Sequence, residues 1–187
     1  RIEGKVFLDT EVHNSALFAF AYDDINSLVY FGDKLKGYWT KESEDIIKII
    51  SSALDEYEEI ISRCNSFSTQ LYQDGVNSGG EKYAEILMLA YRQTIAAHKL
   101  CEDTNGELLF ISKECFSNGC AATVDVTYPS MPLFLLFNPK LIKAMLRPIF
   151  KYANTDTWFY EFAPHDAGSY PFLNGQWYSE GTDPTYQ

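Results

Sequence analysis

The sequence predicts a mainly α-helical fold with a strand pair at its start. Residues 5–31 alternate and cluster as β-strands do. From Thr40 onward, apolar residues recur every three or four positions, which is the period of an amphipathic helix. After about residue 158 the chain is rich in glycine and proline and has neither period. Helices separated by polar loops should therefore follow a short β-region.

The first element is a predicted β-hairpin. One strand is the aromatic segment Ser15–Tyr22, and the other is Ser27–Phe31. Asp23, Asp24 and Asn26 lie between them and are typical turn residues. Because a lone hairpin is marginal in water, its other partner strands are expected outside this chain.

Two helices are predicted next. The first covers residues 40–64, with isoleucines and leucines on one face. Asp74-Gly75 and Gly79-Gly80 predict a connection. The second helix covers residues 81–100 and is apolar almost all round, which predicts burial between other elements.

A short hairpin and a third helix complete the predicted elements. Asn105-Gly106 is a strong turn signal and places a hairpin near residues 104–116. The third helix is expected over residues 139–153, because Asn138 is a good N-cap and Pro139 suits the first helical position. These helices cannot close a core around the second one, so we expect a larger helical assembly. The isolated chain should expose apolar surface and associate with itself or with the rest of a parent protein.

Composition excludes several classes of function. The chain has 187 residues and a formal net charge of -11, which argues against nucleic-acid binding because that needs clustered lysine and arginine. No apolar run is long enough to span a membrane. The four cysteines form no C-x-x-C pair, so no metal is expected. Cys115 and Cys120 could bridge, but buried free thiols are favoured. No phosphate-binding loop or dinucleotide fingerprint occurs, so no cofactor is expected.

Several motifs in one order resemble a known family. These are Leu89-Ala-Tyr-Arg-Gln93, Phe110-Ile-Ser-Lys-Glu114 with Ser117-Asn-Gly119, Thr123-Val-Asp-Val-Thr-Tyr-Pro129, and Phe162-Ala-Pro-His-Asp166 followed by Asn174-Gly-Gln176. Together they resemble the glutaminase A family, whose members are secreted microbial proteins. The resemblance covers nearly the whole chain. One departure is Phe67-Ser68, where the family pattern has Phe-Asp.

The resemblance implies a fold, a location and an activity. The fold would be part of an (α/α)6 toroid of six helical hairpins, with residues 1–37 ending an upstream β-rich region and residues 38–187 beginning the toroid. The location would be secreted or periplasmic. The activity would be hydrolysis of L-glutamine to glutamate and ammonia. Two alternatives stay open: a glycoside hydrolase of (α/α)6 type with paired carboxylates, and a non-catalytic carbohydrate-binding or assembly module.

Three carboxylates are the candidate catalytic residues. Asp125 lies between β-branched residues in a segment expected to be extended, where burial would be costly without a purpose. Asp166 and Glu114 lie in the two polar segments that are framed by aromatic and glycine residues. Carboxylates suit acid and base hydrolysis, whereas the sequence has no serine or cysteine nucleophile motif.

Five further residues are candidates for substrate binding, and the substrate would be a small molecule or a glycan. They are Lys113, Asn118, Tyr128, His165 and Arg92. Neighbours in an extended chain point to opposite sides, so His165 and Asp166 are not expected to form a pair. Asn118 is most simply a turn residue. Arg92 is expected to bind a carboxylate.

Overall fold

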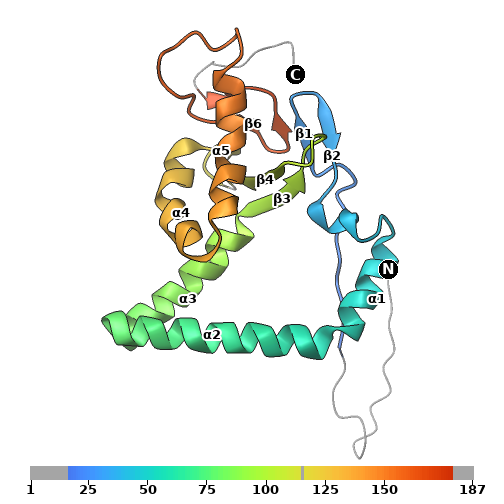
Figure 1. Cartoon of the computed structure of the whole chain (residues 1–187), viewed down its shortest axis with the longest axis vertical. Helices are drawn as coiled ribbons and strands as arrows, with labels where there is room; N and C mark the ends of the chain where they lie inside the picture. The colour runs from blue at the N-terminus through green and yellow to red at the C-terminus, as the bar shows by residue number, and fades with distance from the viewer. Residues whose placement is uncertain (1–16, 115, 179–187) are drawn as a thin grey trace, which may run out of the picture.

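The computed structural model describes residues 17–114 and 116–178, and helices make up most of its regular structure (Figure 1). The helices are α1 (Ile46–Asp55), α2 (Tyr57–Gly79), α3 (Glu81–Ala96), α4 (Val124–Phe137), α5 (Pro139–Ala153) and a 3-10 turn, η1 (Tyr38–Lys41). The strands are β1 (Leu28–Tyr30), β2 (Asp33–Leu35), β3 (His98–Glu102), β4 (Leu108–Ser112), β5 (Cys120–Ala121), β6 (Gly168–Ser169) and β7 (Phe172–Leu173). The prediction of a mainly α fold is confirmed.

The N-terminal hairpin exists, but with a different partner strand. β1 pairs with β2, and Tyr30 faces Asp33 across a two-residue turn. Both turn residues have positive φ, Phe31 at 48° and Gly32 at 93°, which is the turn geometry that matches strand twist. Residues 17–22 have no regular structure and remain exposed. The other end of that predicted strand lies outside the described residues. The aromatic residues of this segment therefore do not indicate a strand.

The predicted helix over 40–64 is two helices. Asp45 accepts a hydrogen bond from the Ile47 N–H at 2.9 Å and so begins α1. The helical path breaks at Glu56, and α2 then continues to Gly79. The predicted connection at Asp74-Gly75 is wrong, because both residues lie inside α2. The prediction at Gly79-Gly80 is correct, since Gly80 links α2 to α3 with a φ of 83°.

Gly75 has a packing role in α2. A Cβ atom at this position would lie 2.8 Å from the Ala84 Cα of α3, closer than real contacts allow. The missing side chain lets the two helices approach closely here, and both Gly75 and Ala84 are buried. A glycine that reads as a loop signal is therefore a helix-contact residue.

The second predicted helix ends earlier than expected, and it is not buried. α3 stops at Ala96, and the chain enters β3 at His98. Ala84 is its one buried residue, whereas Ile86 is 66% exposed and Leu89 is 57% exposed. The predicted burial does not occur within the described part of the chain, where α3 packs against α2 but leaves an apolar face uncovered.

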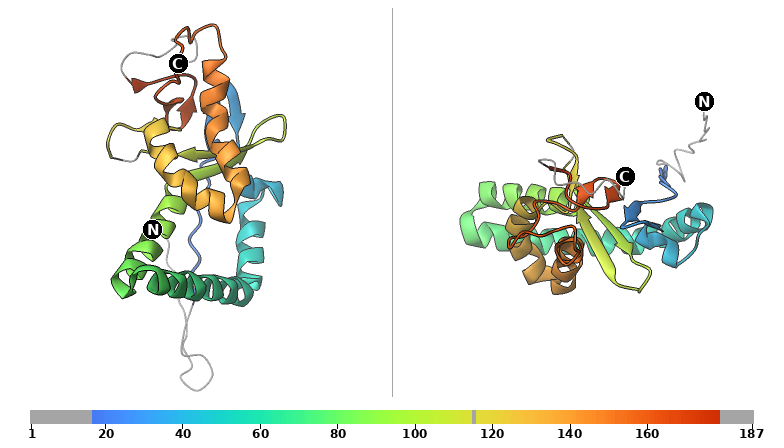
Figure 2. Two further views of the ribbon diagram at one scale, coloured as in Figure 1. Left: turned by 60° about the vertical axis from the view of Figure 1, so that its left-hand side comes forward. Right: turned by 90° about the horizontal axis from the view of Figure 1, so that it is seen from above.

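The predicted hairpin forms around the Asn105-Gly106 turn, but its first strand, β3, begins at His98, inside the segment that was predicted to be helical. The two strands pair antiparallel from His98 with Ser112 to Glu102 with Leu108. Gly106 takes a φ of 80° in the turn. The hairpin connects α3 to the upper part of the molecule (Figure 2).

Helix α4 was not predicted, because Pro129 and Pro132 lie within it. Tertiary packing compensates for the lost backbone hydrogen bonds. Phe134 is buried, and its ring lies 5.3 Å from that of Phe110 and 5.5 Å from that of His98. The segment around Asp125, expected to be extended, is therefore the first turn of a helix.

Helix α5 confirms the prediction for residues 139–153. The Asn138 side chain accepts a hydrogen bond from the Lys140 N–H at 3.2 Å, and Pro139 takes the first position. Ala144 and Met145 are buried in a cluster with Phe110 and Phe134, so α5 covers the β3–β4 hairpin and α4.

A five-stranded sheet joins the two ends of the described chain. Its strand order is β2-β1-β7-β6-β5, with β1 and β7 parallel. The main core lies under this sheet and includes Leu28, Leu109, Ile111, Ala121 and Leu173. Among the described residues, no helix is both long enough and apolar enough to cross a membrane.

Candidate functional site

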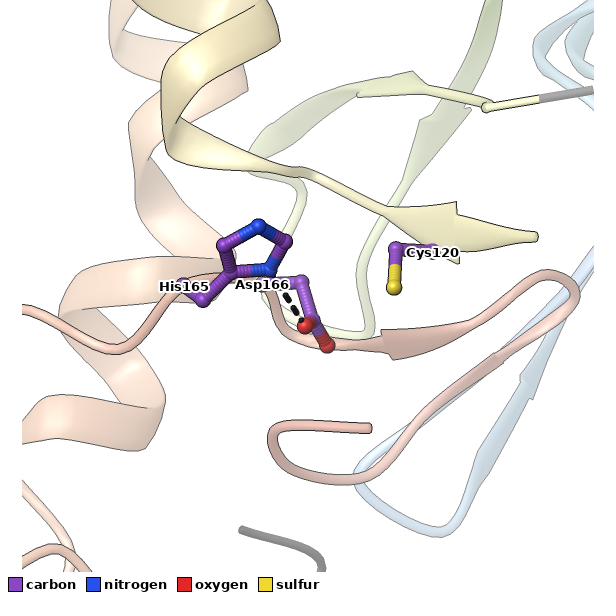
Figure 3. A group of neighbouring side chains, drawn as sticks. All are labelled: Cys120, His165 and Asp166. Carbon is purple, nitrogen blue, oxygen red and sulfur yellow. Dashed lines mark hydrogen bonds and ion pairs between the residues drawn. The ribbon is translucent and has the colours of Figure 1, made fainter. Parts of the chain in front are cut away.

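The polar groups of the two motif-rich segments meet at the edge of the sheet. Strand β5 pairs antiparallel with β6, which places Cys120 opposite Ser169. Two backbone hydrogen bonds extend this contact, from the Ala167 N–H to the Ala121 oxygen at 3.0 Å and from the Val124 N–H to the His165 oxygen at 2.8 Å. Cys120, His165 and Asp166 therefore lie together (Figure 3).

Asp166 is fully buried, and four N–H groups donate hydrogen bonds to it. Its Oδ1 accepts from the Gly168 N–H at 2.9 Å and from the Trp177 N–H at 2.7 Å. Its Oδ2 accepts from the Tyr178 N–H at 3.1 Å and from His165 Nδ1 at 2.9 Å. An ionised carboxylate is an acceptor only, so this arrangement suits a charged Asp166 that fixes the surrounding loop.

His165 and Asp166 form a pair, and the expectation that they would not is wrong. The chain bends at His165 and Ala167 instead of running extended, so neighbouring side chains converge. The imidazole also stacks on the Tyr178 ring, with centroids 4.5 Å apart. Because Nδ1 donates to Asp166, the other ring nitrogen, Nε2, carries the lone pair. The His165 side chain is 29% exposed.

Cys120 is a buried free thiol in this cluster. Burial, together with the nearby charges of Asp166, Glu114 and Asp125, raises its pKa to about 12. A thiol that stays protonated is a poor nucleophile. The geometry thus agrees with the absence of a cysteine-nucleophile motif. Cys101 is also buried and free, but Cys64 is exposed, and Cys115 lies outside the described residues.

The end of β4 carries Lys113 and Glu114 to the same region. Lys113 lies over the Tyr170 ring, 5.5 Å from its centroid. Glu114 is half-buried and accepts a hydrogen bond from the Ser117 hydroxyl. Asn118 accepts from the Cys120 N–H at 2.9 Å, so it is a turn residue as expected.

Asp125 and Tyr128 lie in the first turns of α4 and are exposed. The argument that Asp125 is buried among apolar residues is therefore wrong. The Val124 N–H, one residue earlier, donates to the His165 oxygen at 2.8 Å, so the start of α4 lies beside the cluster. A carboxylate in the first turn of a helix is also favoured by the helix dipole, which gives Asp125 a structural role that needs no substrate.

Arg92 lies elsewhere. It is exposed on α3 and lines a depression of about 1070 Å³ between α2 and α3, whose walls are mostly apolar. Within the described residues it forms no ion pair, so the expected carboxylate partner is not found there. The structure thus brings Glu114, Asn118, His165 and Asp166 to one region, through the backbone of Cys120 or through their own contacts, with Lys113 beside them on Tyr170. Tyr128 is exposed on α4, and Arg92 lies apart.

Cys120 was not among the site residues predicted from the sequence. Only the β5–β6 pairing shows that it faces the His165–Asp166 pair. The available signal was its position directly after the Asn118-Gly119 turn, inside the motif-rich segment.

Two family models match this chain. A family model described as the glutaminase A six helical-hairpin domain matches residues 80–185, which include the whole cluster. The chain belongs to the glutaminase A family. A second model, Domain of unknown function (DUF5127), matches residues 4–74.

Two curated proteins are similar over most of the chain. A protein named as a probable glutaminase from Arthroderma benhamiae is 27% identical over 177 residues, covering 92% of this chain and 20% of the relative. Glutaminase A of Aspergillus oryzae is 32% identical over 121 residues, covering 64% of this chain and 17% of the relative. The chain thus spans about a fifth of the length of these relatives. No solved structure matches significantly.

Proposed function

We propose that the protein carrying this chain hydrolyses L-glutamine to glutamate and ammonia, with His165 as the general base. The observation that carries the proposal is the 2.9 Å hydrogen bond between His165 Nδ1 and Asp166 Oδ2, in a family whose curated relatives are named glutaminases. The toroid of six hairpins, the boundary at residue 37 and the secreted location belong to the same proposal.

The pair suits proton transfer to and from water. Asp166 fixes the Nδ1–H tautomer, and Nε2 takes a proton from the water that attacks the side-chain amide carbon of glutamine. The C–N bond then breaks, and the imidazolium returns the proton to the departing ammonia. Asp166 stabilises the imidazolium without receiving the proton, because its oxygens are occupied by donors.

Free glutamine also needs groups that bind its charged end. The amino acid carries an ammonium and a carboxylate, and the adjacent residues Glu114 and Lys113 offer one charge of each sign. Both lie close to the cluster, since the Glu114 N–H donates to the Cys120 oxygen at 3.0 Å. Asn118 and Tyr128 are the remaining candidates for contact with substrate on this side of the molecule.

A glycosidase remains the second candidate because several carboxylates surround the site. In that reading Asp166 is not a suitable acid, since it is fully buried and fully hydrogen-bonded. Glu114 and Asp125 would then form the pair. A binding module is the third candidate, and it predicts no turnover of either substrate.

Assays on the intact polypeptide separate these functions. We expect ammonia release from glutamine and no cleavage in a glycan screen; the opposite result would favour the glycosidase, and neither activity would favour a binding module. His165→Gln and Asp166→Asn should each lower kcat about a hundredfold or more. Asp125→Asn is the matched control, with a small effect expected. Near-native rates for His165→Gln would refute the role of His165 but not that of Asp166. If Asp166→Asn also keeps a near-native rate, as the control Asp125→Asn should, the proposed site is wrong.

A further inference from the structure

We propose that Cys120, His165 and Asp166 form a binding site for a thiophilic divalent metal ion, of which Zn²⁺ is the most suitable. Each offers one donor atom, the Cys120 Sγ, a His165 ring nitrogen and an Asp166 oxygen, and these atoms all lie within 4.8 Å of one another. Sulfur, imidazole nitrogen and carboxylate oxygen are the three types of donor that bind Zn²⁺ in proteins.

The spacing of the donors fits an ion after a small adjustment. Bond lengths of about 2.0–2.3 Å in a tetrahedral zinc site put the donor atoms roughly 3.2–3.8 Å apart. His165 Nδ1 and Asp166 Oδ2 are 2.9 Å apart, so an ion would separate them slightly and replace the proton between them. In Figure 3, Asp166 and Cys120 both lie on the Nδ1 side of the ring, so the ion would lie between the three side chains.

The surrounding structure holds the donors in place. The Asp166 oxygen that does not face His165 is fixed by the Gly168 and Trp177 N–H groups, which is the outer support that metal-binding carboxylates usually have. Cys120 is fixed by the β5–β6 pairing. Gly168 permits the close approach of β6 to β7, because a Cβ there would lie 2.1 Å from the Phe172 oxygen.

The donor set selects the class of metal. A thiolate ligand favours Zn²⁺ or Co²⁺ over Mg²⁺ and Ca²⁺, which prefer oxygen. Binding converts the Cys120 S–H to a thiolate and releases that proton to water. The proton that the ion displaces from His165 Nδ1 is made up by one at Nε2, so the imidazole stays neutral and no oxidant or reductant is needed. Asp166 and Cys120 are fully buried while His165 is 29% exposed, so the ion would enter past the imidazole.

The inference is separate from the proposed hydrolysis, because binding is measured without substrate. An ion on Nδ1 puts the ring proton on Nε2, so the metal-bound form cannot use His165 as a base. Co²⁺ is added to the intact, metal-stripped polypeptide under reducing conditions. We expect one equivalent to bind and to produce a thiolate-to-cobalt charge-transfer band. Cys120→Ser should abolish the band and weaken binding at least about tenfold. The exposed Cys64 gives the matched control, and Cys64→Ser should keep the band.

A thermal measurement distinguishes loss of metal binding from loss of folding in the Cys120→Ser variant. At a Zn²⁺ concentration about a hundred times its Kd, the wild-type Tm should rise roughly 5–10 °C. The folded Cys120→Ser protein, checked by circular dichroism, should show at most a small part of this rise. Absence of a band in the wild type, or a band that persists in Cys120→Ser and disappears in Cys64→Ser, would overturn the proposal.

Discussion

The sheet with its site and the α2–α3 pair use apolar residues in opposite ways. In the sheet region, strands of two to five residues bury Leu28, Leu109, Ile111 and Leu173 completely. Helix α2 is 23 residues long and buries only Leu71 and Gly75. One region closes its own core, whereas the other presents a mostly apolar depression to its surroundings.

The two regions are also stabilised by different interactions. Around the site, long-range hydrogen bonds fix the chain, such as those from the Trp177 and Tyr178 N–H groups to Asp166. The helix pair depends on close approach at Gly75 and Ala84 and on ring contacts between Phe67, Tyr91 and Phe137. Contacts within the described residues therefore hold the site, whereas the same residues leave the face of the helix pair uncovered.

The largest expected effect on stability is in the sheet region, at Asp166. Asp166→Asn puts an amide NH2 group among four donors, so at least one buried N–H loses its acceptor. The free energy of unfolding should fall by about 3 kcal/mol. Asp125→Asn removes a carboxylate that is exposed, and should change stability by less than about 0.5 kcal/mol.

Urea unfolding of both variants measures this contrast. An Asp166→Asn protein as stable as the wild type would mean that the hydrogen bonds around Asp166 do not hold the region together.

A smaller effect tests the contact between α2 and α3. Gly75→Ala adds a Cβ that would lie 2.8 Å from the Ala84 backbone, so the helices must separate. This cost exceeds the gain in helix propensity, which is about 1 kcal/mol, and we expect a net loss of roughly 1–2 kcal/mol.

Ser66→Ala, at an exposed position of the same helix, introduces the same side chain and should be neutral or slightly stabilising. Thermal melts followed by circular dichroism compare the two. Stabilisation by Gly75→Ala would show that the two helices can move apart freely.

The smallest effect on stability is expected on the uncovered face of α3. A change there should mainly alter self-association. Leu89→Lys should change the unfolding free energy by less than about 0.5 kcal/mol, because Leu89 is 57% exposed. The 187-residue chain should self-associate through this face, and the variant should weaken association about tenfold.

Ser62→Lys adds the same charge to an exposed polar position of α2 that does not line the depression, and is the control. Sedimentation velocity at several concentrations gives the association constants. A wild-type chain that stays monomeric at all concentrations would remove the argument for a covering partner.

Local signals explain what could be predicted from the sequence. Asn138-Pro139 and Asn105-Gly106 each determine the backbone through their own residues, so the third helix and the hairpin were placed correctly. Helix α4 was missed because its prolines argue against a helix locally, and only Phe134 packing on distant aromatics compensates.

The site was predicted as a region but not as a geometry. Its candidate carboxylates were recognised from their unusual aromatic setting. The His165–Asp166 pair depends on bends that bring donors from residues 177 and 178 onto one carboxylate, and Cys120 joins through a strand pairing of only two residues. Contacts of this kind have no local sequence signature, so no spacing rule could find them.

The parallel pairing of β1 with β7 has a consequence for synthesis. The Val29 N–H donates to the Pro171 oxygen and the Phe31 N–H to the Leu173 oxygen, both at 2.9 Å. At a bacterial or eukaryotic rate of about 5–20 residues per second, β1 leaves the ribosome on the order of ten seconds before this partner exists. Helices α2 and α3 make local contacts and can form during that interval. The His165–Asp166 loop, by contrast, takes its shape only after its last donor, Tyr178, has been made.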